Sequence, residues 1–127
     1  YEKYKKKLKN FSNYIFFPNY ENLNGASFHL NIIHLNFLNI KGNKDDFIKY
    51  LNKFKIFPQY HYIPIYRLKL LKNVKPSKYT GSEKYFLSAL SLPIYVNLNN
   101  KMLSFVIKKI ISYIKKNKKE CLKINQF

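Results

Sequence analysis

The side chains best suited to chemistry in this 127-residue chain gather in residues 61–67, His-Tyr-Ile-Pro-Ile-Tyr-Arg. An imidazole can donate or accept a hydrogen bond, a tyrosine adds a hydroxyl to a flat apolar ring, and a guanidinium pairs with phosphate. His61, Tyr62 and Arg67 are therefore candidates for contacts with the hydroxyl and phosphate oxygens of a ligand. In the alternative interpretation, the apolar and aromatic members of this stretch only fix it to the core, and backbone groups satisfy His61.

Two further histidines, His29 and His34, raise the question of a metal site. On a regular strand a separation of five places them on opposite faces, and no carboxylate or cysteine nearby completes a ligand set. The single cysteine, Cys121, can form neither an internal disulfide nor a zinc site. We therefore predict no metal site. The sequence also contains no glycine-rich phosphate loop, no Ser/His/Asp pattern and no paired catalytic carboxylates.

The formal net charge of +18 would ordinarily favour a nucleic acid or an anionic membrane as partner. However, Arg67 is the one arginine among 24 basic residues, whereas bidentate contacts to phosphates and guanines favour arginine. The densest lysine runs, in residues 1–10 and 108–123, fall on amphipathic helical patterns, where they are typical of a solvated face. We expect no nucleic acid and no membrane as partner, and a cytoplasmic protein. A basic nucleic-acid-binding module and a non-catalytic interaction domain remain alternatives.

The first half of the chain predicts helix, strand and helix. Residues 1–13 carry apolar side chains at helical spacing with no capping residue before them, so we expect a helix that continues from a longer chain. Residues 28–38 alternate like a strand, but the phase slips at Ile32-Ile33, which predicts a bulge or a strand buried on both sides at its centre. Asn43 is predicted to cap a helix that carries Asp45 and Asp46 in its first turn.

The second half of the sequence predicts the elements on either side of residues 61–67. Residues 56–60 are predicted as a short edge strand because of Pro58, and residues 61–79 as a long loop. Thr80 and Glu83 have capping-box spacing for a helix to residue 90, and residues 91–96 are predicted to be extended. Apolar residues at helical spacing predict a last helix after a cap at Asn99 or Asn100, followed by a frayed tail over residues 118–127. This order predicts an α+β fold in which helices cover one side of a small, mostly antiparallel sheet.

Two stretches in this order and at this separation carry a family resemblance: residues 61–66, His-Tyr-Ile-Pro-Ile-Tyr, and residues 90–93, Leu-Ser-Leu-Pro, followed by Leu98. With Ser27-Phe28-His29 before the first strand, they resemble the C-terminal part of the DegT/DnrJ/EryC1/StrS-type sugar-nucleotide aminotransferases, which use pyridoxal phosphate (PLP). The first stretch is most similar to the branch of UDP-4-amino-4,6-dideoxy-N-acetyl-beta-L-altrosamine transaminases, in pseudaminic acid biosynthesis. The sequence departs from the family at Lys55, where a glycine is common.

The resemblance implies that residues 1–127 form one C-terminal small domain, as in fold-type-I PLP aminotransferases, with residues 1–13 as the end of a connecting helix. The implied reaction moves an amino group from an amino-acid donor, glutamate, to the 4-keto carbon of a UDP-linked sugar. Another 4-keto-hexose aminotransferase of the family is the nearest rival.

The implied site divides between this chain and sequence upstream of it. PLP and its Schiff-base lysine would belong to a large domain upstream, so we expect no catalytic and no cofactor-binding residue here, and no activity from this part alone. Substrate contacts are expected at His29, His61, Tyr62 and Arg67, whereas the Leu-Ser-Leu-Pro segment is expected to be structural. The whole protein is expected to be a homodimer.

Overall fold

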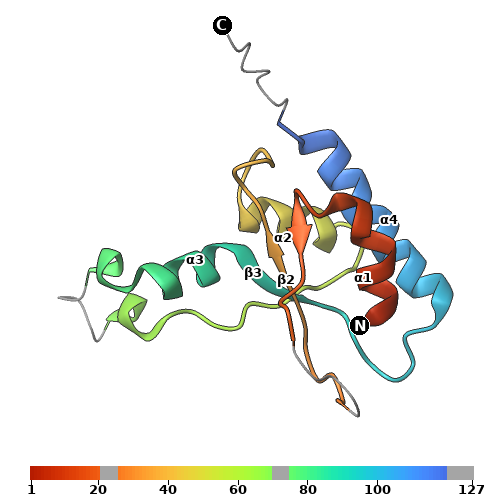
Figure 1. The fold of residues 1–127 in the computed structure, drawn as a ribbon, viewed down its shortest axis with the longest axis horizontal. Coiled ribbons are helices and arrows are strands. Elements are labelled where there is room, and N and C mark those ends of the chain that lie inside the picture. The colour runs from red at the N-terminus through yellow and green to blue at the C-terminus, as the bar shows by residue number, and fades with distance from the viewer. Residues whose placement is uncertain (21–25, 70–74, 120–127) are drawn as a thin grey trace, which may run out of the picture.

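The computed structural model describes residues 1–20, 26–69 and 75–119 (Figure 1). The elements in chain order are α1 (Glu2–Leu8), β1 (Ile15–Phe16), β2 (Asn31–Leu35), α2 (Lys44–Asn52), α3 (Thr80–Ser88), β3 (Ala89–Leu92) and α4 (Asn100–Asn117). Short 3-10 helices follow α1 (η1, Lys9–Phe11) and lie before α3 (η2, Ile65–Arg67, and η4, Pro76–Tyr79). The three strands form an antiparallel sheet in the order β1-β2-β3. The predicted α+β fold is thereby confirmed.

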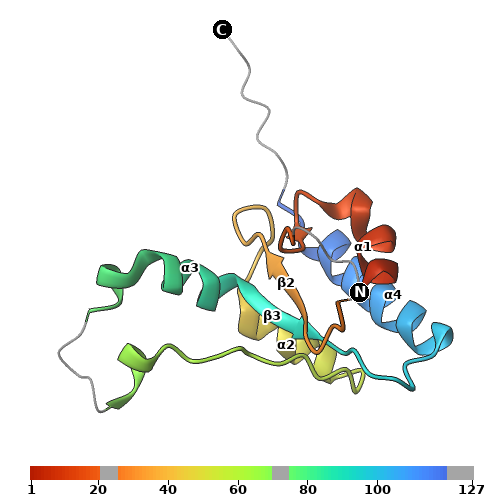
Figure 2. The ribbon, with the colours of Figure 1, turned by 60° about the horizontal axis from the view of Figure 1, so that its bottom comes forward.

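One face of the sheet forms the core with α1, α2 and α4, which lie together against it in both views (Figures 1 and 2). The predicted apolar stripe of α4 is confirmed, because its buried residues are Leu103, Val106, Ile107, Ile110, Tyr113 and Ile114. Helix α1 runs beside α4 and is tied to it by hydrogen bonds from lysines, such as Lys3 Nζ to Asn100 Oδ1 at 2.9 Å. None of the helices within the described ranges has the length and apolarity that crossing a membrane requires.

The expectation of a bulge or a doubly buried centre in the first long strand is wrong. Strand β2 pairs regularly with β3 from Asn31↔Leu92 to His34↔Ala89, and alternate residues are buried from Asn31 to Leu35. Of the apolar residues of the earlier phase, Phe28 lies before the strand and stacks on Tyr1 with ring centroids 4.2 Å apart, whereas Ile32 lies within the strand and is half-buried. The change of phase at Ile32-Ile33 therefore lies within β2, where Ile33 belongs to the buried face and Ile32 to the half-buried face.

Two of the three predicted helix caps form. Asn43 and Asp46 build a capping box on α2, with Asp46 N donating to Asn43 Oδ1 at 3.1 Å and Asn43 N donating to Asp46 Oδ2 at 3.0 Å. Asn99 caps α4 by accepting from Met102 N at 2.9 Å.

The capping box predicted at Thr80 is wrong. The residue before α3 is Tyr79, and it makes no side-chain capping bond. Glu83 instead accepts two hydrogen bonds from Arg67, and a carboxylate held by a guanidinium in this way does not reach back to its own helix. Thr80 and Glu83 have the spacing of a capping box, but the carboxylate of Glu83 forms its hydrogen bonds with Arg67, which is 16 residues away.

One predicted strand and the predicted tail also differ from the structure, and one strand was not predicted. Residues 56–60 contribute a single bridge, Gln59 to Ser91, and no strand, whereas β1 was not predicted. Lys118 and Lys119, the first residues of the predicted frayed tail, are paired with the chain near Ile40, and Lys119 N donates to Asn39 O at 2.9 Å. Residues 120–127 lie outside the described residues.

Helix α3 and the segment that carries η2 extend together away from the body of the molecule (Figure 1). They are joined by the Arg67–Glu83 ion pair and by the stacked rings of Tyr66 and Tyr79, whose centroids lie 4.9 Å apart. His61 and Tyr62 stand where this extension leaves the body.

Candidate functional site

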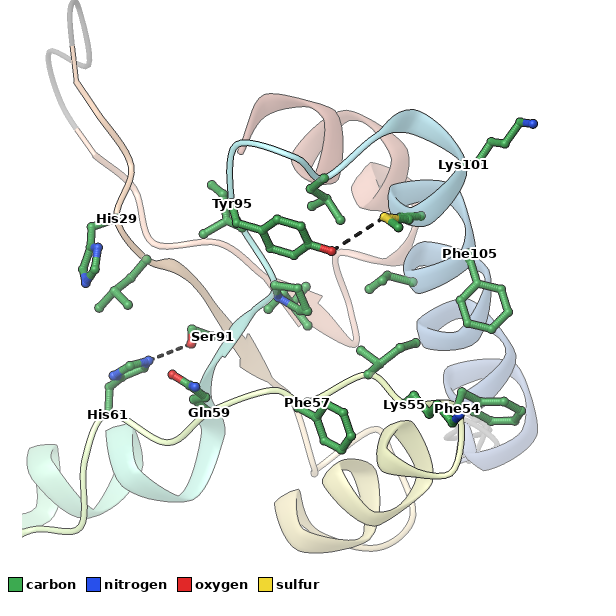
Figure 3. A pocket seen from close by; sticks show the side chains of 18 of the residues that line it. His29, Phe54, Lys55, Phe57, Gln59, His61, Ser91, Tyr95, Lys101 and Phe105 are labelled. Carbon is green, nitrogen blue, oxygen red and sulfur yellow. Dashed lines mark hydrogen bonds between the residues drawn. The ribbon is translucent and has the colours of Figure 1, made fainter.

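A cavity of about 960 Å³ opens beside the end of β3 (Figure 3). Its walls come from residues 29–30 before β2, from residues 54–62 after α2, from residues 91–98, and from the first two turns of α4. Three of the four predicted contact residues, His29, His61 and Tyr62, line it. The fold therefore gathers into one cavity side chains that lie far apart in the sequence.

The position of His61 is fixed by a backbone bridge two residues earlier. Gln59 N donates to Ser91 O at 3.1 Å, and Ser91 N donates to Gln59 O at 2.9 Å. This bridge brings the imidazole of His61 to Ser91, where Nε2 and Oγ are 2.6 Å apart. The other ring nitrogen, Nδ1, is buried and has no partner among the described residues. The two stretches that carry the family resemblance thus meet at this hydrogen bond.

The rest of the cavity wall combines aromatic faces with two lysines. Phe57 and Tyr95 are 64% and 54% exposed, and Tyr95 Oη lies 3.7 Å from Met102 Sδ. Lys55 and Lys101 also line the cavity, and both are exposed. Such a wall offers apolar faces to a flat or sugar-like group and positive charge to phosphate oxygens.

Arg67 lies outside the residues that line this cavity. Its Nε and terminal nitrogen donate to the two carboxylate oxygens of Glu83 at 2.9 and 2.5 Å, and its guanidinium lies 4.9 Å above the ring of Phe86. The hydrogen bonds from Arg67 lower the pKa of the Glu83 carboxyl. A contact between Arg67 and phosphate stays a prediction.

A buried lysine, which the sequence did not single out, holds α3 against α2. Lys44 Nζ donates to the carbonyl oxygens of Phe86 and Ala89 at the C-terminal end of α3, and it lies 4.5 and 4.3 Å from the ring centroids of Tyr60 and Phe86. Burial lowers the pKa of Lys44 to about 8. Lysines commonly satisfy the last carbonyls of a helix, and aromatic faces favour the cation. This contact anchors Tyr60, the residue before His61.

The third histidine, His34, lies outside the residues that line this cavity. Its Nδ1 lies 2.9 Å from Ser88 Oγ, its ring stacks on Phe16, and burial lowers its pKa. His29, in contrast, is exposed at the cavity. Among the described residues no three histidine, cysteine, aspartate or glutamate side chains come together in a way that could hold a metal ion.

Ser91 is the cavity residue that sequence reasoning missed, because the Leu-Ser-Leu-Pro segment was expected to be structural. The signal was present: a serine stands between two leucines in a segment where every residue of the strand is buried. A hydroxyl in such a place needs a partner, and the partner is His61. The partner itself lies 30 residues earlier, which no local pattern shows.

The chain was compared with known proteins by sequence and by fold. The profile described as the DegT/DnrJ/EryC1/StrS aminotransferase family matches residues 1–111. A search of curated proteins found no significant match.

Several solved structures have the same fold as this chain. Aminotransferase TlmJ from Streptoalloteichus hindustanus is similar with a TM-score of 0.75 at 15% identity, over 91% of this chain and 30% of that one. Helicobacter pylori PseC, an aminotransferase involved in the biosynthesis of pseudoaminic acid, is similar with a TM-score of 0.70 at 23% identity, over 89% of this chain and 30% of that one. The PLP-form of the sugar aminotransferase Spr1654 from Streptococcus pneumoniae has a TM-score of 0.69 at 16% identity, with coverages of 91% and 30%.

These likenesses establish the fold, and the chain spans about 30% of the length of the structures it matches. The family profile covers residues 1–111, from α1 into α4, and includes both stretches that meet at His61 and Ser91. This chain belongs to the DegT/DnrJ/EryC1/StrS aminotransferase family.

Proposed function

We propose that this chain is the C-terminal small domain of a PLP-dependent aminotransferase that transfers an amino group from an amino-acid donor, glutamate, to the 4-keto carbon of a UDP-linked sugar. The pathway we propose is pseudaminic acid biosynthesis for surface glycans, in the cytoplasm of a bacterium. The observation that carries the proposal is the cavity, where the two family stretches converge and where His29, His61 and Tyr62 stand together. The likeness in fold to PseC and to Spr1654 supports it.

In this proposal the cavity forms one wall of the nucleotide-sugar site. His61 and His29 offer ring nitrogens to hydroxyl and diphosphate oxygens, and Tyr62, which is 74% exposed, offers its hydroxyl and the edge of its ring. Lys55 and Lys101 supply positive charge at the rim of the same cavity. These residues bind and orient the substrate, and no proton transfer is assigned to them.

The described cavity does not fit PLP itself. PLP needs a lysine amine and a carboxylate partner for its pyridinium nitrogen. The cavity lining contains no aspartate or glutamate among the described residues, and its two lysines are exposed. Within the proposal, PLP is therefore held by the large domain, which would form the rest of the site and the contacts of a homodimer. The chain alone is then expected to be inactive.

The experiment that tests the proposal is a titration of the chain with UDP-N-acetylglucosamine, followed by NMR of the histidine and tyrosine rings. We expect saturable shifts at His29, His61 and Tyr62 and none at His34, which lies outside the cavity. Loss of one hydrogen-bonding group costs about 1.4 kcal/mol, so His61→Ala should raise the Kd about tenfold. His34→Ala is the matched control and should leave the Kd unchanged.

Two results would contradict the proposal. The first is the absence of any saturable shift at the cavity residues. The second is binding of duplex DNA with a steep dependence on salt while the UDP-sugar gives no response, which would favour a basic nucleic-acid-binding module. In the full-length protein, mass spectrometry of the sugar product made with glutamate would identify the substrate and separate the pseudaminic acid branch from another 4-keto-hexose aminotransferase.

A further inference from the structure

The hydroxyl of Ser91 is buried in an apolar strand and faces a single ring. Its neighbours Leu90 and Leu92 are 1% and 2% exposed, and Ser91 itself is 6% exposed. Among the described residues Ser91 Oγ has one hydrogen-bond partner, His61 Nε2, at 2.6 Å. The Gln59–Ser91 bridge holds the two backbones in register, so this contact is in place before any ligand arrives.

The direction of this hydrogen bond follows from counting donors and acceptors. A serine hydroxyl carries one donor, and a neutral imidazole carries one donor nitrogen and one acceptor nitrogen. If Ser91 accepted from Nε2–H, its own buried proton and the lone pair of Nδ1 would both lack partners among the described residues. If Ser91 donates to Nε2, only Nδ1–H remains unmatched. Since each buried unmatched group is costly, the second arrangement is favoured.

We propose, on the basis of the proposed function, that Ser91 is a positioning residue for His61. Its hydroxyl donates to Nε2 and holds the imidazole as the Nδ1–H tautomer, which presents an N–H donor to an acceptor oxygen of the nucleotide sugar. Nδ1 is buried, so the ring or its neighbour must move to admit that oxygen. The neighbour with room to move is Tyr62, which stands edge-on to the imidazole at 4.9 Å and is 74% exposed.

The chain contains a second serine–histidine pair that serves as an internal comparison. Ser88 Oγ donates to the carbonyl oxygen of Lys84 at 2.8 Å, so its proton is already used. It therefore accepts from His34 Nδ1, which lies 2.9 Å away. Both histidines are thus expected as Nδ1–H tautomers. In His34 the Nδ1–H donates to Ser88, whereas in His61 the proton is on Nδ1 because Nε2 accepts from Ser91. Each serine can be removed without touching the other pair.

The tautomers are read directly from the ring nitrogen shifts of the 15N-labelled chain at pH 8, where an ordinary imidazole is neutral. We expect His61 to show a protonated Nδ1 and an acceptor-type Nε2. In Ser91→Ala the His61 ring should lose this preference while the His34 signals stay in place, which also reports an intact fold. Ser91→Thr keeps the hydroxyl and should keep the wild-type His61 tautomer. Ser88→Ala should change His34 alone.

The same samples are then titrated with UDP. Ser91→Ala should weaken UDP binding about tenfold relative to Ser88→Ala. A wild-type His61 that carries its proton on Nε2, a His61 tautomer that survives in folded Ser91→Ala, or equal UDP affinity in wild type and Ser91→Ala would each overturn the role of Ser91. If the tautomers behave as expected but UDP does not bind the wild-type chain, the proposed function is what fails, and the Ser91–His61 pairing stands.

Discussion

Lys55 provides the sharpest test of how this chain holds its cavity together. It stands three residues beyond the end of α2 with φ of 58°, in the left-handed region. There its N–H donates to Asn52 O at 3.0 Å, and the N–H of Ile56 donates to Leu51 O at 3.2 Å. This pair of bonds closes the end of the helix in the manner that usually requires glycine. The departure from the family at this position, noted in the sequence, therefore falls on the residue whose backbone most needs a glycine.

The expected effect of Lys55→Gly is a more stable protein. A side chain in the left-handed region costs about 1 kcal/mol relative to glycine, and the exposed Lys55 side chain contributes no core packing to offset that cost. The free energy of unfolding should therefore rise by about 1 kcal/mol. With a urea m-value of about 2 kcal/mol/M, the midpoint of unfolding moves upward by about 0.5 M at unchanged m.

Two matched variants separate the backbone effect from the loss of charge. Lys55→Ala removes the same charge but keeps a Cβ in the strained conformation, so its midpoint should stay close to that of the wild type. Lys53→Gly introduces a glycine two residues earlier, where φ is −58°, and should lower stability by up to about 1 kcal/mol. The reasoning would be refuted if Lys55→Gly unfolded at the same urea concentration as Lys55→Ala.

Three further predictions concern buried groups, and urea unfolding measures each of them. Burial lowers the pKa of Lys44 in the folded state to about 8, below the ordinary 10.5, so at this residue the unfolded chain binds more protons between these values. The free energy of unfolding of the wild type relative to that of Lys44→Met should therefore rise from pH 8 to pH 10, and a difference that does not change with pH would contradict the lowered pKa. Asn31 is 0% exposed, and neither its amide nitrogen nor its amide oxygen has a partner among the described residues. Asn31→Val should therefore raise the free energy of unfolding by about 1 kcal/mol. A loss of stability would mean that a water or a further group satisfies the amide. Ile110→Ala should cost about 2–5 kcal/mol because Ile110 is 0% exposed, whereas the exposed Ser112→Ala should cost less than about 0.5 kcal/mol, and equal losses would contradict the assigned core.

The elements that sequence reasoning predicted well are those whose signals are local. The caps of α2 and α4 are side-chain bonds across three residues, and the apolar stripe of α4 repeats within the helix itself. Errors arose where a distant residue competed for the same group. Glu83 has the spacing of a capping residue, yet Arg67, 16 residues away, takes both of its carboxylate oxygens.

The candidate site shows the same difference between what residue type indicates and what distant contacts decide. His29, His61 and Tyr62 were selected from residue type and from the family resemblance, and the fold places all three at one cavity. Arg67 was selected on the same grounds, but it lies outside the lining. Ser91 was assigned to structure because a serine in a buried strand gives no sign, in sequence, of which ring it will meet.

The sequence by itself determined the kind of protein: the order of the helices, the family stretches, and the residue types available for binding oxygens. Only the tertiary structure decided which of those side chains share a surface, because pairing across Gln59 and Ser91 and across Arg67 and Glu83 depends on contacts between segments far apart in the chain. Local propensity is set by neighbours within a few residues, whereas a site is set by the packing of elements on the sheet. The imidazole of His61 became a positioned group when β3 brought a hydroxyl to it.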